Sequence, residues 1–281
     1  MPVLAAGPFV KWAGGKQGLL EQFKPFFPRQ FNGYIEPFVG SGAVFFYVAR
    51  RFNPSRVILM DSNQELISTY QAIQTNASEV TARLERLKRT HSKHQYLSVR
   101  DQTVEQLTKV ERAARFIYLN KTCFNGLYRV NSRGQFNVPM GRYVHPKIFD
   151  AEVLQAVSAA LKGVALKAES YERCLEYAQT GDFIYFDPPY HPLSRTANFT
   201  SYTKDSFGES DQERLAEVFV KLHKRKCFVM LSNSDTPFIE KLYENQRFEL
   251  VRVKARRAIN SDASKRGAIT ELVVINYKSD Q

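Results

Sequence analysis

The chain has 281 residues, of which 43% are hydrophobic, and its formal net charge is +12. A chain of this length can bury roughly three quarters of its unfolded surface, so we expect one large domain, or one domain with a sizeable insertion. Three cysteines about fifty residues apart exclude a disulfide framework and a metal site with paired cysteine ligands. We see no signal peptide and no apolar run long enough to span a membrane, and therefore expect a cytoplasmic protein.

The first 65 residues predict the opening of a parallel α/β sheet. A short strand at 34–36 leads into a glycine-rich turn, "EPFVGSG", and an apolar pattern predicts a helix over 43–52. The run "RVILMD" at 56–61 indicates a buried strand that ends on an acid. Strand, glycine turn, helix and strand in this order is typical of α/β proteins that bind a ligand at the carboxyl ends of their strands.

The glycine turn is a candidate cofactor site, although a packing turn explains most isolated GxG matches. Gly40 and Gly42 allow the backbone to approach a ligand, and Asp61 lies 19 residues beyond Gly42, where its carboxylate could accept hydrogen bonds from a ribose. Phe45 stands where a dinucleotide-binding turn has its third glycine, so a nucleoside cofactor without a pyrophosphate is favoured over NAD. The segment "WAGGK" lacks the spacing of a phosphate loop, which excludes NTP hydrolysis.

The alternation of strands and helices stops between residues 66 and 160, where helical patterns and polar loops predominate. This region also holds most of the positive charge, because residues 83–147 contain 14 lysines and arginines but four acidic residues. A second basic stretch runs over residues 251–267. Such clustering favours a polyanion, first of all a nucleic acid, as the partner; the alternative is a basic surface that is merely solvated.

Strands return after residue 160. Apolar runs predict strands at 164–170, 182–187, 227–233, 247–255 and 268–277, and an amphipathic pattern predicts a helix over 209–225. We therefore expect one α/β catalytic domain, made of residues 1–65 and 161–281, that is interrupted by a mostly helical insertion, residues 66–160. In this division the sheet carries the chemistry and the insertion contacts the polyanion.

The segment "DFIYFDPPY" ends a predicted strand on a carboxylate, two prolines and a tyrosine. Asp187 stands at the carboxyl end of the strand, Pro188 and Pro189 stiffen the turn and keep their carbonyl groups as acceptors, and Tyr190 offers a flat ring. These groups suit a planar ring with an exocyclic amine, because the ring can stack while the amine donates its two hydrogens to Asp187 and a carbonyl. The alternative is an ordinary proline turn in which the aspartate is a cap.

Several motifs together resemble the Dam-type DNA adenine-N6 methyltransferases, of the alpha class of amino-methyltransferases. The matching segments, in the order of that family, are "KWAGGK", "EPFVGSG", "NGLYRVNSRGQFNVPMGRY", "DPPY", "ANFTSY" and "LSNSDT". The resemblance covers nearly the whole chain and implies a Rossmann-like mixed sheet of the S-adenosylmethionine-dependent methyltransferase type with an inserted DNA-recognition domain. It implies methyl transfer from S-adenosylmethionine, without a metal, to N6 of an adenine flipped out of duplex DNA, within GATC.

The resemblance also assigns roles to individual residues. The implied catalytic residues are Asp187, Pro188 and Tyr190. The implied cofactor-binding residues are Trp12, Lys16, Phe38, Gly40, Ser41, Gly42, Asp61 and Asp187. The implied DNA-binding residues are Lys11, Phe124, Asn125, Leu127, Arg129, Pro139, Arg142 and Tyr143.

Within the recognition segment the resemblance implies a division of labour. Arg129 is expected to contact a guanine in the major groove, and Leu127 and Pro139 to touch a thymine methyl group. Phe124 and Asn125 would wedge into the stack that the flipped base leaves. The alternative is that Arg129 contacts only phosphate and Phe124 belongs to the core.

One pair of residues departs from the family pattern: Thr122 and Cys123 stand where Dam-type sequences often carry an aromatic residue and a glycine. Two other functions stay open, a DNA-binding protein with an inactive methyltransferase fold and an amino-methyltransferase that acts on RNA. As partners we expect double-stranded DNA and no membrane. We expect a monomer or a weak dimer on DNA, at the nucleoid of a bacterial or phage-infected cell, acting in restriction–modification or in DNA repair and replication.

Overall fold

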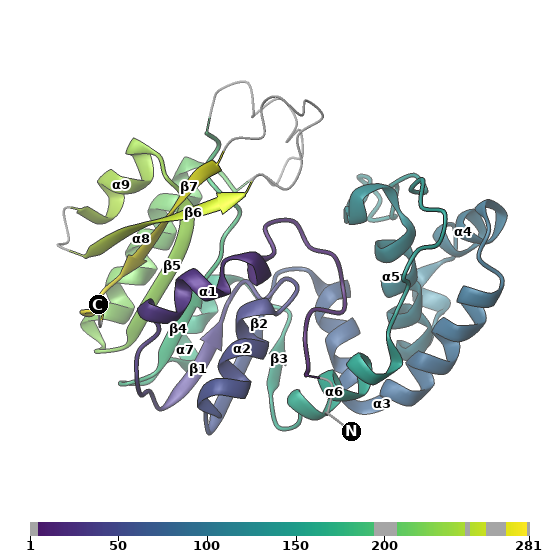
Figure 1. Ribbon diagram of the computed structural model, residues 1–281, viewed down its shortest axis with the longest axis horizontal. Helices are drawn as coiled ribbons and strands as arrows, with labels where there is room; N and C mark the ends of the chain where they lie inside the picture. The colour runs from purple at the N-terminus through teal and green to yellow at the C-terminus, as the bar shows by residue number, and fades with distance from the viewer. Residues whose placement is uncertain (1–4, 194–206, 245–247, 257–267, 280–281) are drawn as a thin grey trace. The chain divides into compact units, whose positions relative to one another are not determined.

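The computed structural model describes residues 5–193, 207–244, 248–256 and 268–279 (Figure 1). The motif "ANFTSY" at 197–202 and the part of the second basic stretch over 257–267 lie outside the described residues. Each helix in the described part of the chain is too short or too polar to span a lipid bilayer. The three cysteines are buried and free, so none of them forms a disulfide.

The strands form a mixed seven-stranded sheet with the order β3-β2-β1-β4-β5-β7-β6. Strands β1, β2, β4 and β5 run parallel, whereas β7 is antiparallel to both β5 and β6. This arrangement confirms the predicted α/β class. The strand bounds are β1 Gly33–Glu36, β2 Arg56–Met60, β3 Ala165–Lys167, β4 Phe183–Phe186, β5 Phe228–Ser234, β6 Glu249–Arg256 and β7 Ala268–Ile275.

Burial explains which sequence patterns became strands. Every residue of β1 and of β4 is buried, as is typical of parallel strands that are covered on both faces. The strand expected over 164–170 is shorter, β3 Ala165–Lys167, and its residues are only half-buried. It stands first in the strand order, so it has a neighbour on one side alone, and fewer of its residues are held by pairing.

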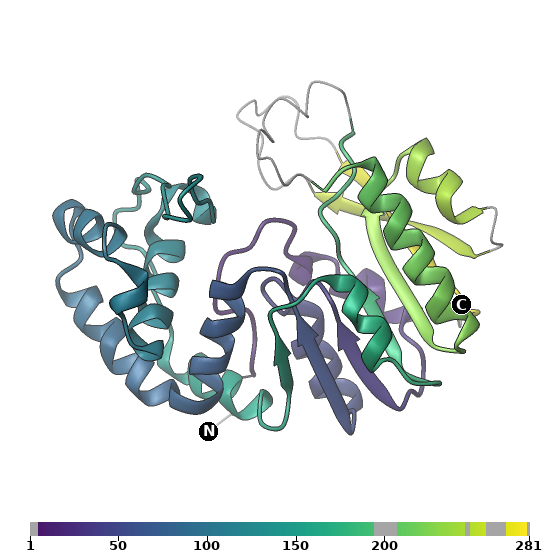
Figure 2. The same cartoon turned by 180° about the vertical axis from the view of Figure 1, so that it is seen from behind.

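The helices follow the predicted patterns closely. The helix predicted over 43–52 is α2, and the helix predicted over 209–225 is α8, which packs against β5 (Figure 2). The α-helices of the described residues are α1 Leu20–Phe23, α2 Ala43–Phe52, α3 Gln64–Arg89, α4 Lys93–Arg100, α5 Lys109–Thr122, α6 Ala151–Ala160, α7 Cys174–Tyr177, α8 Glu209–Lys224 and α9 Pro237–Glu244. Single 3₁₀ turns lie at Lys16–Gly18, Lys24–Phe26, Val104–Gln106, Phe124–Gly126 and Tyr171–Arg173.

The chain forms two compact units. The first consists of Met1–Gly15, Val39–Arg51 and Met60–Glu169, and the second of Lys16–Phe38, Phe52–Leu59 and Ser170–Gln281. The first unit is mainly helical, and the second contains most of the sheet. The boundaries that the sequence suggests for an inserted domain, 66–160, stay a prediction.

In the first unit α5 is the central support. It packs against α3, which itself packs against α6, and a capping box of Thr108 and Glu111 begins it. The buried Arg115 donates from Nε to the Val99 carbonyl over 2.9 Å and from a terminal nitrogen to the Arg100 carbonyl over 2.7 Å. These bonds tie α5 to the end of α4, so the loop that follows α5 starts from a fixed base.

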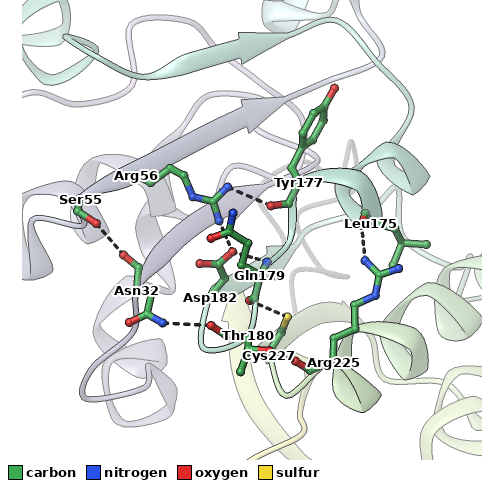
Figure 3. Close-up of polar contacts among 10 residues, drawn as sticks. All are labelled: Asn32, Ser55, Arg56, Leu175, Tyr177, Gln179, Thr180, Asp182, Arg225 and Cys227. Carbon is green, nitrogen blue, oxygen red and sulfur yellow. Dashed lines mark hydrogen bonds and ion pairs between the residues drawn. The ribbon is translucent and has the colours of Figure 1, made fainter.

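In the second unit two carboxylates flank β4 and have different roles. Asp182, at the amino end, is buried; it forms an ion pair with Arg56 of β2 and accepts a 2.8 Å hydrogen bond from the Gln179 backbone N–H (Figure 3). Gly33 of β1 faces it so closely that a Cβ there would lie 2.7 Å from Asp182 Oδ1. Asp182 therefore fixes the strands to one another, whereas Asp187 follows the carboxyl end, the edge where ligands of parallel sheets bind.

An aromatic cluster covers one face of β4 within the same unit. Phe183 contacts the rings of Phe27 and Phe31, with centroids 5.9 and 5.3 Å apart, and Tyr185 contacts Phe23 at 6.3 Å. These contacts hold the segment over 19–31 on the sheet. Lys16 lies just before this segment and is thereby kept close to the carboxyl end of β4.

Candidate active site

Asp187 is the centre of a polar cluster in the second unit. Lys16, whose side chain is 3% exposed, places Nζ 2.8 Å from Asp187 Oδ1, and Ser232 Oγ donates to the same oxygen over 3.0 Å. Burial raises the pKa of Asp187 above its usual range, while the Lys16 ammonium and the Ser232 hydroxyl oppose that rise. A small set of donors at the end of a buried strand thus favours the ionised carboxylate, against the effect of burial.

Two contacts fix the side chain of Tyr190, one at its ring and one at its hydroxyl. Lys16 Nζ lies 4.5 Å from the centroid of its ring, a cation–π contact, and its hydroxyl donates to Glu271 Oε2 over 2.6 Å. Burial raises the pKa of Glu271 as well. The ring expected to stack on a base is therefore oriented by charged groups on two separate parts of the chain.

Hydrogen bonds also stiffen the proline turn. The Pro189 carbonyl accepts from Gln212 Nε2 over 2.9 Å, and Asn233 Oδ1 accepts from the His191 backbone N–H over 3.1 Å. Asn233 and Gln212 are themselves joined, at 3.0 Å. For the Pro188 carbonyl the described residues provide no hydrogen-bond donor.

Sequence reasoning missed four of these supporting residues: Ser232, Glu271, Gln212 and Asn233. Two signals were available. The motif "LSNSDT" contains Ser232 and Asn233, but it was used only as a resemblance. Glu271 is the single acid in the apolar run that became β7, where a charged side chain is unusual unless it has a partner.

The predicted cofactor turn is in the first unit, where Asp61 organises it. The Gly40 N–H donates to Asp61 Oδ2 over 3.1 Å, and the Asn63 N–H donates to Asp61 Oδ1 over 2.9 Å. The Tyr70 hydroxyl donates to the Gly40 carbonyl over 3.1 Å. Burial raises the pKa of Asp61, and these two backbone donors act in the opposite direction. The turn between β1 and α2 is therefore closed around a half-buried carboxylate.

Trp12 covers the glycine turn. Gly40 has φ +47°, and a Cβ there would lie 2.6 Å from Trp12 Cδ1. The indole also stacks with Tyr128, at 6.0 Å between centroids and 27° between planes. Ser41 is buried beside them. The predicted cofactor residues of the first unit are thus brought together, whereas Lys16 and Phe38 lie in the second unit, Phe38 stacked on Tyr171 at 5.2 Å.

Replacing Gly40 by alanine is expected to destabilise the turn. The left-handed backbone costs an alanine about 1–2 kcal/mol, and its methyl group would push Trp12 away. Trp12 is the one tryptophan of the chain, so its fluorescence emission should shift in Gly40→Ala while the melting temperature falls. Gly7→Ala is the matched control, since Gly7 has open space around its Cα. Equal melting temperatures and emission for both variants would contradict this expectation.

The predicted DNA-binding residues lie in the first unit, Lys11 near the start of the chain and the others on the loop after α5. Isolated bridges pair Cys123 with Met140 and Val130 with Phe136, which makes a small hairpin. Phe124 is 48% exposed, which excludes the alternative that it is a core residue. Leu127, Asn125, Pro139, Arg142 and Tyr143 are also exposed. We call residues 123–143 the recognition loop.

Arg129 and Lys11 are both held in place at this loop. Arg129 Nε donates to Asn137 Oδ1 over 2.8 Å, across the hairpin. Lys11 Nζ lies 4.1 Å from the centroid of the Tyr143 ring. Cys123, the departure from the family pattern, is buried and donates from Sγ to the Leu127 carbonyl over 3.2 Å. Burial raises the pKa of its thiol to about 11, so it is a structural thiol at the base of the loop.

Comparison with known proteins adds independent evidence. The family model of D12 class N6 adenine-specific DNA methyltransferases matches residues 12–259. The chain is 44% identical to the Type II methyltransferase M1.LlaDCHI of Lactococcus lactis subsp. cremoris, over 96% of this chain and 95% of that protein. It is 43% identical to the Type II methyltransferase M.MjaIII of Methanocaldococcus jannaschii, over 96% and 99%. It is 38% identical to the DNA adenine methylase of Escherichia coli K12, over 96% and 95%.

These matches extend over the glycine turn, the recognition loop and the Asp187 cluster alike. Together with the mixed seven-stranded sheet they confirm the predicted methyltransferase fold and the resemblance read from the sequence motifs. The chain therefore belongs to the D12 class of N6 adenine-specific DNA methyltransferases, and it is an adenine-specific DNA methyltransferase.

Proposed function

We propose that the chain transfers a methyl group from S-adenosylmethionine to N6 of an adenine in duplex DNA, within GATC. The observation that carries this proposal is the Asp187 cluster: a carboxylate held by Lys16 and Ser232 at the end of β4, followed by a stiff turn and the fixed ring of Tyr190. Membership of an adenine-specific family supports the choice of base.

The glycine turn fits a nucleoside. Gly40 and Gly42 both have positive φ, and they let the turn close against Trp12 and the Tyr70 hydroxyl, which a Cβ would approach within 2.6 and 2.7 Å. Asp61 accepts one backbone hydrogen bond on each oxygen, and a carboxylate has further lone pairs to accept from ribose hydroxyls. We propose that Trp12, Ser41, Lys16 and Phe38 complete the binding of the cofactor. When bound, S-adenosylmethionine supplies a methyl group on a positively charged sulfur, which is a good leaving group.

The residues around Asp187 make the amine reactive. The nitrogen of an exocyclic amine is a poor nucleophile because its lone pair is delocalised into the ring. Asp187 and the Pro188 carbonyl would each accept one amine hydrogen, which favours a pyramidal nitrogen with a directed lone pair. Tyr190 would stack on the ring, and Glu271 fixes the tyrosine hydroxyl. Positioning and electrostatic stabilisation would then supply the rate enhancement.

Duplex DNA is the partner that we propose. The strongly basic stretch over 83–147 includes the recognition loop, whose exposed apolar and basic side chains suit base edges and phosphates. We propose that the target adenine is flipped out of the duplex, because an amine inside the stack is out of reach of a carboxylate at a strand end. We also propose that the protein acts in the cytoplasm of a bacterial or phage-infected cell, as a monomer or a weak dimer on DNA.

Incubation with radiolabelled S-adenosylmethionine tests the reaction and the substrate together. Duplexes with GATC should be labelled, while duplexes without it and RNA of the same sequence should remain unlabelled. Label in no nucleic acid would favour the inactive fold, and label in RNA would favour an RNA amino-methyltransferase. Equal label in all DNA duplexes would support methyl transfer to DNA but contradict the proposed GATC recognition site. Binding of the cofactor can be followed separately by the fluorescence of Trp12.

Replacing Arg129 by alanine is expected to relax discrimination at a single base pair. A bidentate contact from arginine to guanine is worth about 1–3 kcal/mol of discrimination, so the preference at that pair should fall by roughly 5- to 160-fold. The measurement compares methylation rates on GATC and on each single-pair variant. Arg133, on the same hairpin, is the control: Arg133→Ala should keep the preference. If Arg129→Ala weakens all duplexes equally, Arg129 contacts phosphate.

A further inference from the structure

A buried amide joins two segments of the first unit that are far apart in sequence. Asn120, in the last turn of α5, is 0% exposed. Its Oδ1 accepts from the Lys11 backbone N–H over 2.7 Å, and its Nδ2 donates to the Lys11 carbonyl over 2.8 Å. The same Nδ2 donates to the Gly126 carbonyl in the recognition loop over 3.1 Å. Both hydrogens of the amide and its oxygen are therefore in use.

These hydrogen bonds satisfy the backbone N–H and carbonyl of Lys11, as the pairing within a helix or sheet would. Residues 5–15 form no helix and no strand, so regular pairing does not satisfy the backbone of Lys11. Asn120 supplies a donor to its carbonyl and an acceptor for its N–H, as a neighbouring strand would. The position of Lys11 thus depends on one side chain, and few residues other than asparagine offer a donor and an acceptor at this reach.

The side chain of Lys11 is fixed by the same contact. The Lys11 side chain fits against the loop because residue 126 is a glycine. A Cβ at Gly126 would lie 2.5 Å from Lys11 Cβ and Cδ. Lys11 Nζ then reaches the Tyr143 ring, at 4.1 Å from its centroid, on the loop that also exposes Phe124 and Leu127. The ammonium is held at the exposed rim of the recognition loop without a carboxylate partner among the contacts of the described residues.

We propose that Asn120 is a positioning residue for target recognition: it fixes Lys11 against the recognition loop so that the ammonium contacts the DNA at a set place. This inference rests on the proposed function, since it takes Lys11 and the recognition loop as DNA-binding. Asn120 itself is buried and touches no nucleotide. It acts through Lys11, so its loss should reproduce the loss of Lys11.

The test compares three variants, Lys11→Ala, Asn120→Ala and the double variant, on GATC duplexes and all single-pair changes. Lys11→Ala and Asn120→Ala should each reduce the preference at the same base pair by about tenfold, the effect of losing one polar contact to a base. The double variant should lose no more than either single variant, because residues that act through one contact are not additive. Trp12 emission should shift in Asn120→Ala, as the residue after Lys11 moves.

Asn276→Ala is the matched control. Asn276, in the second unit, also bridges backbone groups, since it accepts from the Val229 N–H over 2.8 Å and donates to the Cys227 carbonyl over 2.9 Å. Its replacement should lower the melting temperature and leave the preference as in the wild type. If Asn120→Ala does not fold, Asn120→Asp replaces it: it keeps the size and the acceptor but presents a carboxylate to two carbonyls, and should give the same loss of preference.

The outcomes separate this inference from the proposed function. A wild-type enzyme that labels no DNA overturns the proposed function. A wild-type enzyme with a sequence preference that Asn120→Ala retains overturns the role of Asn120 alone. A uniform loss of rate on all duplexes, or a loss at a different base pair from that of Lys11→Ala, also overturns it, because a merely structural residue behaves in that way.

Discussion

Replacing Asp187 by alanine is expected to abolish methyl transfer while leaving DNA binding nearly unchanged. The carboxylate stands at the end of β4 with Lys16 and Ser232 as donors, and it is the group proposed to accept a hydrogen from the target amine. Without it the nitrogen keeps its delocalised lone pair, and the rate should fall at least about a hundred- to a thousandfold, as when one preorganised group is removed from an active site. Single-turnover kinetics and a DNA-binding titration would measure the two effects separately.

Glu213 supplies the control for this experiment. It is an exposed carboxylate of α8 in the same unit, so Glu213→Gln removes a similar charge away from the cluster and should keep full activity. Asp187→Asn is informative as well, because the amide keeps one acceptor and adds a donor that competes with the amine. Turnover by Asp187→Ala within tenfold of the wild type would refute the role assigned to this carboxylate.

Replacing Lys16 by methionine is expected to shift the acidic limb of the pH–rate profile to higher pH. Burial already raises the pKa of Asp187, and the Lys16 ammonium is the main group that opposes this rise. Removing it raises the pKa further, so the carboxylate becomes protonated, and activity is lost, at a higher pH than in the wild type. At neutral pH the rate should fall by about a hundredfold, the scale of losing one charge contact in an active site.

The measurement is the pH dependence of the single-turnover rate for wild type, Lys16→Met, Lys16→Arg and Lys24→Met. Lys16→Arg keeps the positive charge, so its acidic limb should stay closer to that of the wild type. Lys24 lies in the same segment but is exposed and paired with Glu21, at 2.5 Å, so Lys24→Met should leave the profile unchanged. An acidic limb in Lys16→Met that coincides with the wild type would show that Asp187 is not the group that titrates.

Local patterns predicted most of the fold. The helix over 43–52 has its predicted bounds, because an apolar stripe at helical spacing is set by neighbours along the chain. The strand "DFIYFD" was recognised in the same way, and Asp187 was predicted as a site residue, but the pattern predicted no role for Asp182 and no partner for either acid. They differ because Arg56 and Gly33 face Asp182 while Lys16 faces Asp187, and partners that come from distant segments leave no periodic signal.

The candidate site was predicted where motifs are contiguous and missed where it is assembled by tertiary contacts. The glycine turn and "DPPY" are each a short segment whose residue types suggest a role, and the recognition loop is a short segment that resembles the family's motif. The hydrogen bond from Tyr190 to Glu271 spans 81 residues, and the bond from Lys11 to Asn120 spans 109. Glu271 stands out as an acid in an apolar run, but its partner does not, and only the pairing of strands and the end of α5 bring Glu271 and Asn120 to their partners.

The Lys16 ammonium already donates to Asp187, as the amine of the substrate is proposed to do. Because Lys16 and Ser232 already donate to Oδ1, an amine that takes this oxygen exchanges a hydrogen bond with the carboxylate rather than adding one. Such an exchange contributes little to ground-state affinity, so the selectivity of this carboxylate for an amine is expressed in the rate of the reaction. A bound ligand that mimics only the neutral base would therefore gain little from Asp187, whereas one that carries a positive charge where the methyl group is transferred would gain most.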